Sequence, residues 1–315
     1  MSPEERLRLR KIQAEASHLL LHAVPRRFRN RLKRAREDGE TELVALLEGN
    51  VAGRYLPDQG PGDGFVRQLS PELGLVYRDP DDPVPEAERR LVLLVAGRKG
   101  VLGAPVSLTL NAIGSAGTDV VCLVDSANDH FRAGIPPFGA HFGEAVARLK
   151  EVARRYASVM VIGNSMGGGV AAAIGARIGA DRALGFSPLF PYDIGRLLRG
   201  GRPSAYLPYC ACHSADPARV MLLCAAGVER DRLDVAAISA AMGARAVPLP
   251  GLDRHNIIGV ASSVGALDAW LQAALDLGLG PEALVARFEA LALELARKTA
   301  GKETERVMRV GFPEG

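Results

Sequence analysis

The residues best suited to chemistry form a G-x-S-x-G pattern, Gly163-Asn164-Ser165-Met166-Gly167. A serine hydroxyl is a weak nucleophile, so an enzyme must expose it, place a general base beside it and hold donors where an oxyanion develops. The pattern meets the first need when the serine lies in a tight turn between a strand and a helix, where the crowded backbone tolerates only small neighbours. Ser165 is then a candidate nucleophile for acyl-group chemistry.

The sequence around this pattern supplies the context that such a turn requires. The apolar run VMVI precedes it and predicts a strand, and the segment GGGVAAAIGARIG follows it and predicts a helix. Because the pattern alone often occurs by chance, this context supports the interpretation more than the motif does. Ser165 would lie at the N-terminus of the helix, where free N–H groups and the helix dipole favour a developing oxyanion.

The elements that must position Ser165 follow a regular order after Arg90. Apolar runs of strand length are LVLLVAG, VVCLVD, VMVIG, RALGFS, RVMLLCAAG and RAVPLPG. Predicted helices cover about 105–117, 139–156, 166–179, 193–199, 233–243, 262–277 and 281–298. This alternation is typical of βαβ units with a parallel sheet, and FVRQLS and LGLVYRD ahead of it predict a β-hairpin. The expected fold class is therefore α/β, with a mostly parallel, doubly wound sheet.

From about Arg90 to Leu277 the chain resembles the α/β-hydrolase superfamily, with GNSMGG as its nucleophile elbow. The resemblance implies the α/β-hydrolase fold and a catalytic triad in the chain order serine, acid, histidine. The acid should follow a later strand, and the histidine should follow the last one. No cofactor and no metal are expected.

The histidine that fits this order is His255 in PLPGLDRHNIIG, because it alone of six histidines lies beyond the last predicted strand. The others are His18, His22, His130, His141 and His213. The resemblance thus implies that His255 acts first as general base and then as general acid.

Three carboxylates after RVMLLCAAG are candidates for the acid that orients His255. Asp231 is preferred because it lies where the superfamily's acid would follow its strand. Asp234 stays the alternative, since it would equally suit the cap of a helix beginning at Val235. Glu229 comes third.

Two backbone amides are the expected oxyanion donors. One belongs to Met166, directly after the nucleophile, and the other to Arg98 in the loop after LVLLVAG. The loop has Ala96-Gly97 in place of the common His-Gly pattern, which keeps the backbone donor but does not fit a lipase-like subclass. Arg98 and Lys99 would suit an anionic substrate, although solvated loop cations are more common.

A modest lid is expected at about residues 188–218. Its larger apolar residues are Phe190, Tyr192, Leu197, Leu198, Tyr206 and Tyr209. They would either line an acyl pocket or pack the lid against neighbouring helices, and the sequence favours neither arrangement.

The whole chain is expected to divide into three parts: a basic helical extension at residues 1–60, the hydrolase domain at 61–300 and a C-terminal tail at 301–315. The extension predicts two amphipathic helices broken near Pro25, with the basic run RRFRNRLKRAR as a solvated face or a contact for something acidic. Because its apolar face has no obvious partner in the chain, a homodimer through the extension is a further expectation.

The composition limits the kinds of partner and the cellular location expected for this chain. The 315 residues are 48% hydrophobic and carry a formal net charge of +3, too little to indicate nucleic acid. The start of the chain lacks the apolar stretch of a signal peptide, no window has the length of a bilayer span, and a cytoplasmic protein is expected. Its four cysteines do not form a disulfide framework, and the CACH motif lacks a second pair of zinc ligands.

The expected activity is hydrolysis of a carboxylic ester or thioester, small or bound to an acyl carrier, through an acyl-enzyme on Ser165. Two alternatives stay open. An acyltransferase would use the same triad, and a non-catalytic binding or scaffold protein would retain the fold without turnover. Replacing Ser165 would abolish an enzyme's activity but not a scaffold's role.

Overall fold

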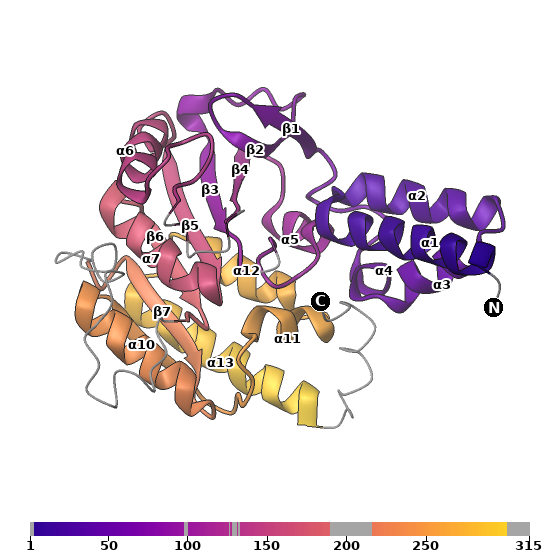
Figure 1. Cartoon of the computed structure of the whole chain (residues 1–315). Coiled ribbons are helices and arrows are strands. Elements are labelled where there is room, and N and C mark those ends of the chain that lie inside the picture. Colours follow the sequence, from indigo (N-terminus) through magenta and orange to yellow (C-terminus); the bar gives the residue numbers. More distant parts are fainter. Residues whose placement is uncertain are drawn as a thin grey trace.

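The computed structural model describes residues 3–97, 100–125, 127, 131, 133–189 and 216–300. Within them one sheet has the strand order β1-β2-β4-β3-β5-β6-β7-β8 (Figure 1). The strands are β1 Val66–Ser70, β2 Gly74–Arg78, β3 Arg90–Val95, β4 Thr118–Leu123, β5 Ser158–Asn164, β6 Arg182–Phe186, β7 Val220–Ala225 and β8 Arg245–Leu249. β2 is antiparallel to β1 and β4, whereas the other neighbours are parallel. The predicted α/β class with its leading hairpin is confirmed.

Helices cover both faces of the sheet, which is why the parallel strands are apolar along their length. In β3, Leu91, Leu93 and Val95 belong to one core, and Val92 and Leu94 belong to the other. The first core includes helices α6 Phe142–Ala153, α7 Met166–Ile178 and α10 Glu229–Met242. The second includes α5 Val106–Ile113, α11 Ile257–Ser263, α12 Leu267–Leu275 and α13 Pro281–Ala300.

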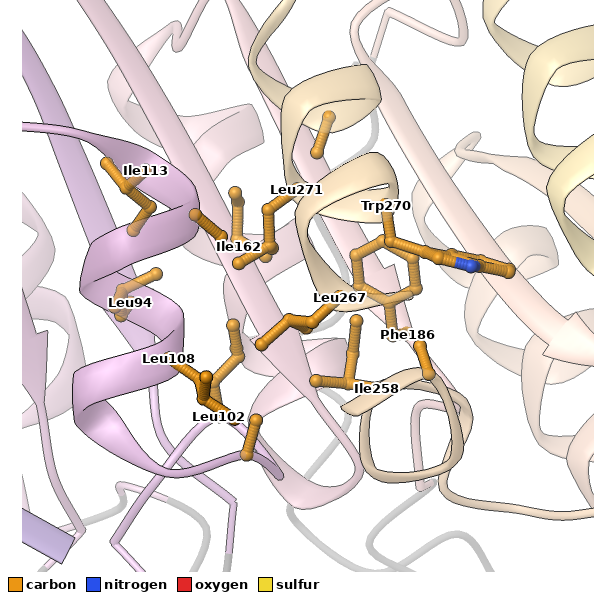
Figure 2. Close-up of a cluster of buried hydrophobic side chains, with 14 of the residues drawn as sticks. Leu94, Leu102, Leu108, Ile113, Ile162, Phe186, Ile258, Leu267, Trp270 and Leu271 are labelled. Carbon is orange, nitrogen blue, oxygen red and sulfur yellow. The ribbon is translucent and has the colours of Figure 1, made fainter. Parts of the chain in front are cut away.

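Figure 2 shows the second core around the fully buried Trp270 of α12. The centroid of its ring lies 6.1 Å from that of Phe186, at the end of β6, in an edge-to-face arrangement. Ile258 of α11 packs into the same core and has no exposed surface. The helix that follows His255 is therefore anchored against the sheet.

Two predicted helices differ from those observed. The closing helix expected over 262–277 is two helices, α11 and α12, separated near Gly265, whose φ of 71° ends a helix. The helix expected from Leu233 already begins at Glu229. The short helix expected at 193–199 lies outside the described residues.

The N-terminal extension contains four helices where two were predicted: α1 Pro3–His22, α2 Pro25–Glu37, α3 Thr41–Gly49 and α4 Val51–Tyr55. Pro25 begins α2 as expected, because proline fits the first position of a helix. A second break follows α2, where Gly39 has a φ of 70°. Figure 1 shows these helices on one side of the sheet domain, next to α5.

The apolar face of the extension packs against the rest of the chain. Leu19, Phe28 and Leu47 are buried in the same core as α5 and α12, and α1, α2 and α4 contact α5. The face on which the homodimer expectation rested is thus already covered, because the chain itself supplies the partner.

Many basic residues of the extension form ion pairs rather than a free charged arm. Arg31 pairs with both Glu15 and Glu40 at 2.6 Å, and Arg29 pairs with Asp63 beyond the helices. Among the described residues no helix is long and apolar enough to span a bilayer.

Candidate active site

Ser165 lies between the last residue of β5 and the first residue of α7. Its φ of 55° and ψ of −123° are unusual for a residue other than glycine, and such conformations cost about 1–3 kcal/mol. Backbone hydrogen bonds hold them: the Ser165 N–H donates to Phe186 O at 2.8 Å, and Ser165 O accepts from Leu189 N–H at 3.1 Å. The surrounding backbone thus keeps Ser165 in a conformation that its own preferences disfavour.

The two glycines of the motif leave room for this turn. A Cβ atom on Gly163 would lie 2.1 Å from Gly167 O, and one on Gly167 would lie 2.3 Å from Val95 O. Both distances are far below van der Waals contact with backbone atoms that cannot move aside. The local sequence thus permits β5, the serine turn and α7 to pack against β3.

A chain of hydrogen bonds connects Ser165 to two residues far away in the sequence. Ser165 Oγ lies 3.0 Å from His255 Nε2, and His255 Nδ1 lies 2.7 Å from Asp231 Oδ1. β5, β7 and β8 are parallel and end at the same edge of the sheet, which brings the segments that follow them together. An ionised carboxylate can only accept, so His255 Nδ1 carries the proton and Nε2 is free to accept the serine hydroxyl.

Burial differs along this chain of residues. The Asp231 side chain is 1% exposed, whereas that of His255 is 34% exposed. Asp231 lies in the first turn of α10, where the helix dipole favours a negative charge. The carboxylate is therefore enclosed, with Oδ1 bonded to His255 and Oδ2 buried without a hydrogen-bond partner among the described residues, and the imidazole remains accessible.

Asp234 does not play the capping role that the sequence suggested. Because α10 begins at Glu229 with Val228 at its N-cap, Asp234 lies in the second turn, inside the helix. It is fully buried and lies 3.7 Å from the Arg230 guanidinium. Glu229, the third candidate, is exposed. Of the three carboxylates, Asp231 is the one hydrogen-bonded to His255.

A strand–serine–helix turn at the centre of a mostly parallel sheet, with a carboxylate after β7 and a histidine after β8, decides the fold. The chain has the α/β-hydrolase fold. The resemblance noted in the sequence is confirmed at this level.

Comparisons with known proteins give matches among solved structures but none to a family model or a curated protein. Among solved structures, esterase B from Lactobacillus rhamnosis is 11% identical, with 87% of this chain and 98% of that chain covered at a TM-score of 0.40. Brefeldin A esterase, a bacterial homologue of human hormone-sensitive lipase, is 18% identical, with 74% and 76% covered at 0.37.

A hyperthermophilic esterase from the archaeon Pyrobaculum calidifontis is 15% identical, with 84% of this chain and 93% of that chain covered at a TM-score of 0.42. All three TM-scores are below 0.5. The α/β-hydrolase fold of this chain is therefore assigned from its own strand order and serine turn.

One of the two expected oxyanion donors lies within the described residues. Met166 is the first residue of α7, where an amide has no acceptor inside the helix. The loop after β3 reaches this place, since a Cβ on Gly97 would lie 3.8 Å from Ser165 Cβ. The second donor, Arg98, lies outside the described residues, as do Lys99 and the six larger apolar residues of the lid.

Cys224, whose thiol interacts with the charge of Asp231, does not compete with the serine as a nucleophile. Burial, and then the negative charge of Asp231, raises the pKa of the Cys224 thiol to about 11, so this cysteine of β7 is neutral near pH 7. Among the described residues no group of three or more His, Cys, Asp and Glu side chains could hold a metal ion. The CACH segment lies outside them.

Sequence reasoning missed Asn256, which directly follows His255. Its side chain begins α11 by accepting the Gly259 N–H at 2.9 Å, and it also accepts a hydrogen bond from Asn164, next to Ser165. An asparagine before the apolar run IIGV is a helix-cap signal that was available. The contact of Asn256 with the serine turn could not be predicted from the sequence, because this contact joins residues 92 positions apart.

Proposed function

We propose that this chain is a serine hydrolase that cleaves a carboxylic ester or thioester through an acyl-enzyme on Ser165. The observation that supports this is the pair of hydrogen bonds from Ser165 Oγ to His255 Nε2, 3.0 Å, and from His255 Nδ1 to Asp231 Oδ1, 2.7 Å. A nucleophile, a base and a group that orients the base are thereby within reach of one another.

In the first half of the reaction, Ser165 Oγ attacks the acyl carbon while His255 Nε2 takes the hydroxyl proton. The Met166 N–H, at the start of α7, donates to the oxyanion, and Arg98 N–H is the proposed second donor. The tetrahedral intermediate collapses as His255 returns the proton to the leaving alcohol or thiol. The acyl group then remains on Ser165.

In the second half, His255 takes a proton from water, and the resulting hydroxide attacks the acyl carbon. Collapse of this intermediate releases the carboxylic acid, and Oγ recovers its proton from His255. Asp231 stays ionised throughout and stabilises the imidazolium that forms in each half. Every proton and electron pair is thus accounted for by protein groups and water, without a metal or cofactor. The substrate class proposed is a small or acyl-carrier-bound ester or thioester.

The deciding experiment is intact-mass measurement after treatment with a fluorophosphonate probe, which modifies an activated serine. Wild type should gain one probe mass, and Ser165→Ala should gain none. Ser107→Ala is the matched control, since Ser107 is a fully buried serine on α5. It should be labelled like the wild type. A folded wild type that stays unlabelled would overturn the proposal and favour a binding or scaffold protein.

A further inference from the structure

One side-chain hydrogen bond connects the segments on either side of the serine–histidine contact. Asn164 Nδ2 donates to Asn256 Oδ1 at 3.2 Å. Asn164 directly precedes Ser165, and Asn256 directly follows His255. This contact, here called the asparagine bridge, lies one residue away from both reacting side chains.

The orientation of both amides follows from their partners. Asn256 Oδ1 also accepts the Gly259 N–H at 2.9 Å, as the N-cap of α11. Since only an oxygen can accept that bond, the same oxygen faces Asn164, which must present its NH₂ group.

Each asparagine is held by a different rigid element. Asn164 ends β5 and lies in register with Phe186 of β6. Asn256 begins α11, where Ile257 and Ile258 are buried in the core. The bridge therefore joins the edge of the sheet to a helix anchored on it.

The loop that carries His255 is fixed at both ends by hydrogen bonds. At one end, the Gly227 N–H donates to Leu252 O at 2.8 Å. At the other end is the bridge at Asn256. His255 lies between these two points, so they limit how far its backbone can move, while Asp231 orients the imidazole through Nδ1 at 2.7 Å.

The surroundings of the bridge are tightly closed. Asn164 is 3% exposed, and the loop after β3 covers it at Gly103. A Cβ on Gly103 would lie 2.6 Å from Asn164 Nδ2 and 2.9 Å from Asn256 Oδ1. Asn256 itself is half-buried, so the bridge is shielded from water mainly on its Asn164 side.

Stability alone does not explain an asparagine at position 164. Its Oδ1 atom is buried without a hydrogen-bond partner, which is unfavourable for folding. An apolar side chain of similar size would avoid that cost. What distinguishes Asn164 from the equally buried Asn111 is its Nδ2 contact with the residue that follows His255.

We propose that Asn164 is a positioning residue, which holds His255 Nε2 in line with Ser165 Oγ through Asn256. The inference rests on the proposed function. Since a displacement of about 1 Å costs a reaction about 100-fold, loss of the bridge should slow attack by Ser165 about 10- to 100-fold.

The test measures the rate of fluorophosphonate labelling in full-length variants. Asn164→Ala removes the donor. Asn256→Ser keeps a helix cap but is too short to reach Asn164, and Asn256→Asp keeps an acceptor for both partners. Asn111→Ala is the matched control, because Asn111 on α5 is also 3% exposed with a buried, unpartnered Oδ1.

Asn164→Ala and Asn256→Ser should each lower the maximal labelling rate about 10- to 100-fold, with the half-saturating probe concentration unchanged. Asn256→Asp should restore labelling, and Asn111→Ala should leave it unchanged. Because both substitutions break the same contact, the double variant should lose no more of its labelling rate than the slower single variant.

Other results would overturn the inference. They are wild-type labelling rates in Asn164→Ala, losses that multiply in the double variant, or slower labelling that only follows a loss of folded protein. A failure of the proposed function is distinguishable, since the wild type itself would then stay unlabelled.

Discussion

Asp231 Oδ1 lies 2.7 Å from His255 Nδ1, although Asp231 belongs to the first turn of α10 and His255 to the loop after β8. Asp231→Asn keeps the shape of the side chain but removes its charge and allows the wrong imidazole tautomer. By analogy with other Ser–His–Asp sites, the turnover of p-nitrophenyl esters should fall about 10³- to 10⁴-fold.

The matched variant is Asp234→Asn, one turn further along the same helix and equally buried. It should change the melting temperature more than the turnover. Equal losses of turnover in the two variants, at equal folded fractions, would contradict the assignment of Asp231.

The crowded serine turn makes Gly167 a sensitive position. In Gly167→Ala the new methyl group would lie 2.3 Å from Val95 O, so β3 or α7 must shift. We expect the free energy of unfolding to fall by about 1–3 kcal/mol, because overpacking a dense core displaces the backbone, and labelling of Ser165 should be lost. Urea denaturation measures the first effect.

Gly143→Ala provides the comparison, because a Cβ there would meet nothing within 4 Å on the exposed side of α6. Its stability should stay unchanged or rise slightly, as alanine favours helices. If Gly167→Ala behaved in the same way, the turn would be less tightly packed than the structure indicates.

His22 of α1 should make folding depend on pH. Burial, and then the positive charges of His18 and Arg67, lower the pKa of His22 below its usual 6.5. The unfolded chain therefore binds a proton at a higher pH than the folded chain does. Stability from this group should be fully present above pH 6.5, fall as the pH drops through 6.5, and level off below the folded pKa.

Urea denaturation from about pH 5 to pH 8 would reveal this, since His22→Gln should flatten the dependence. His141→Gln, at an exposed histidine, should leave the slope unchanged. If the free energy of unfolding had the same slope against pH in wild type and His22→Gln, protonation of His22 would not affect the stability of the fold.

A buried charge network holds the antiparallel strand β2 to the parallel sheet. Asp119 of β4 is fully buried and pairs with Arg78 of β2, with Arg89 Nε at 3.2 Å and with Tyr156 Oη at 2.9 Å. In Asp119→Ala the buried Arg89 would lose this carboxylate. Because Arg89 keeps Asp82 Oδ2 as a partner at 3.0 Å, the cost should lie below the roughly 3–5 kcal/mol of a buried charge left unpaired, and urea denaturation would measure it.

The exposed pair Arg148–Glu151, 2.8 Å apart, is the comparison. Glu151→Ala should cost at most about 1 kcal/mol, because water screens surface ion pairs. Equal costs at the two sites would mean that the Asp119 network does not support the fold.

Features that depend on neighbouring residues can be predicted from the sequence alone. The strand VMVI, the small residues around Ser165 and the helix after it specify the serine turn locally, because φ, ψ and close backbone contacts act over a few positions. The alternation of apolar runs likewise predicts the parallel sheet. The motif order of the family that the chain resembles pointed to His255, whose Nε2 lies 3.0 Å from Ser165 Oγ.

Which distant groups come into contact depends on how the elements pack in three dimensions. It brings Asp231, rather than Asp234 or Glu229, to His255, because α10 begins at Glu229 and turns Asp231 toward the β8 loop. It also pairs Asn164 with Asn256 and buries the extension against α5. Such contacts join residues tens of positions apart, and their distances depend on how packed elements fill space, which local sequence patterns do not encode.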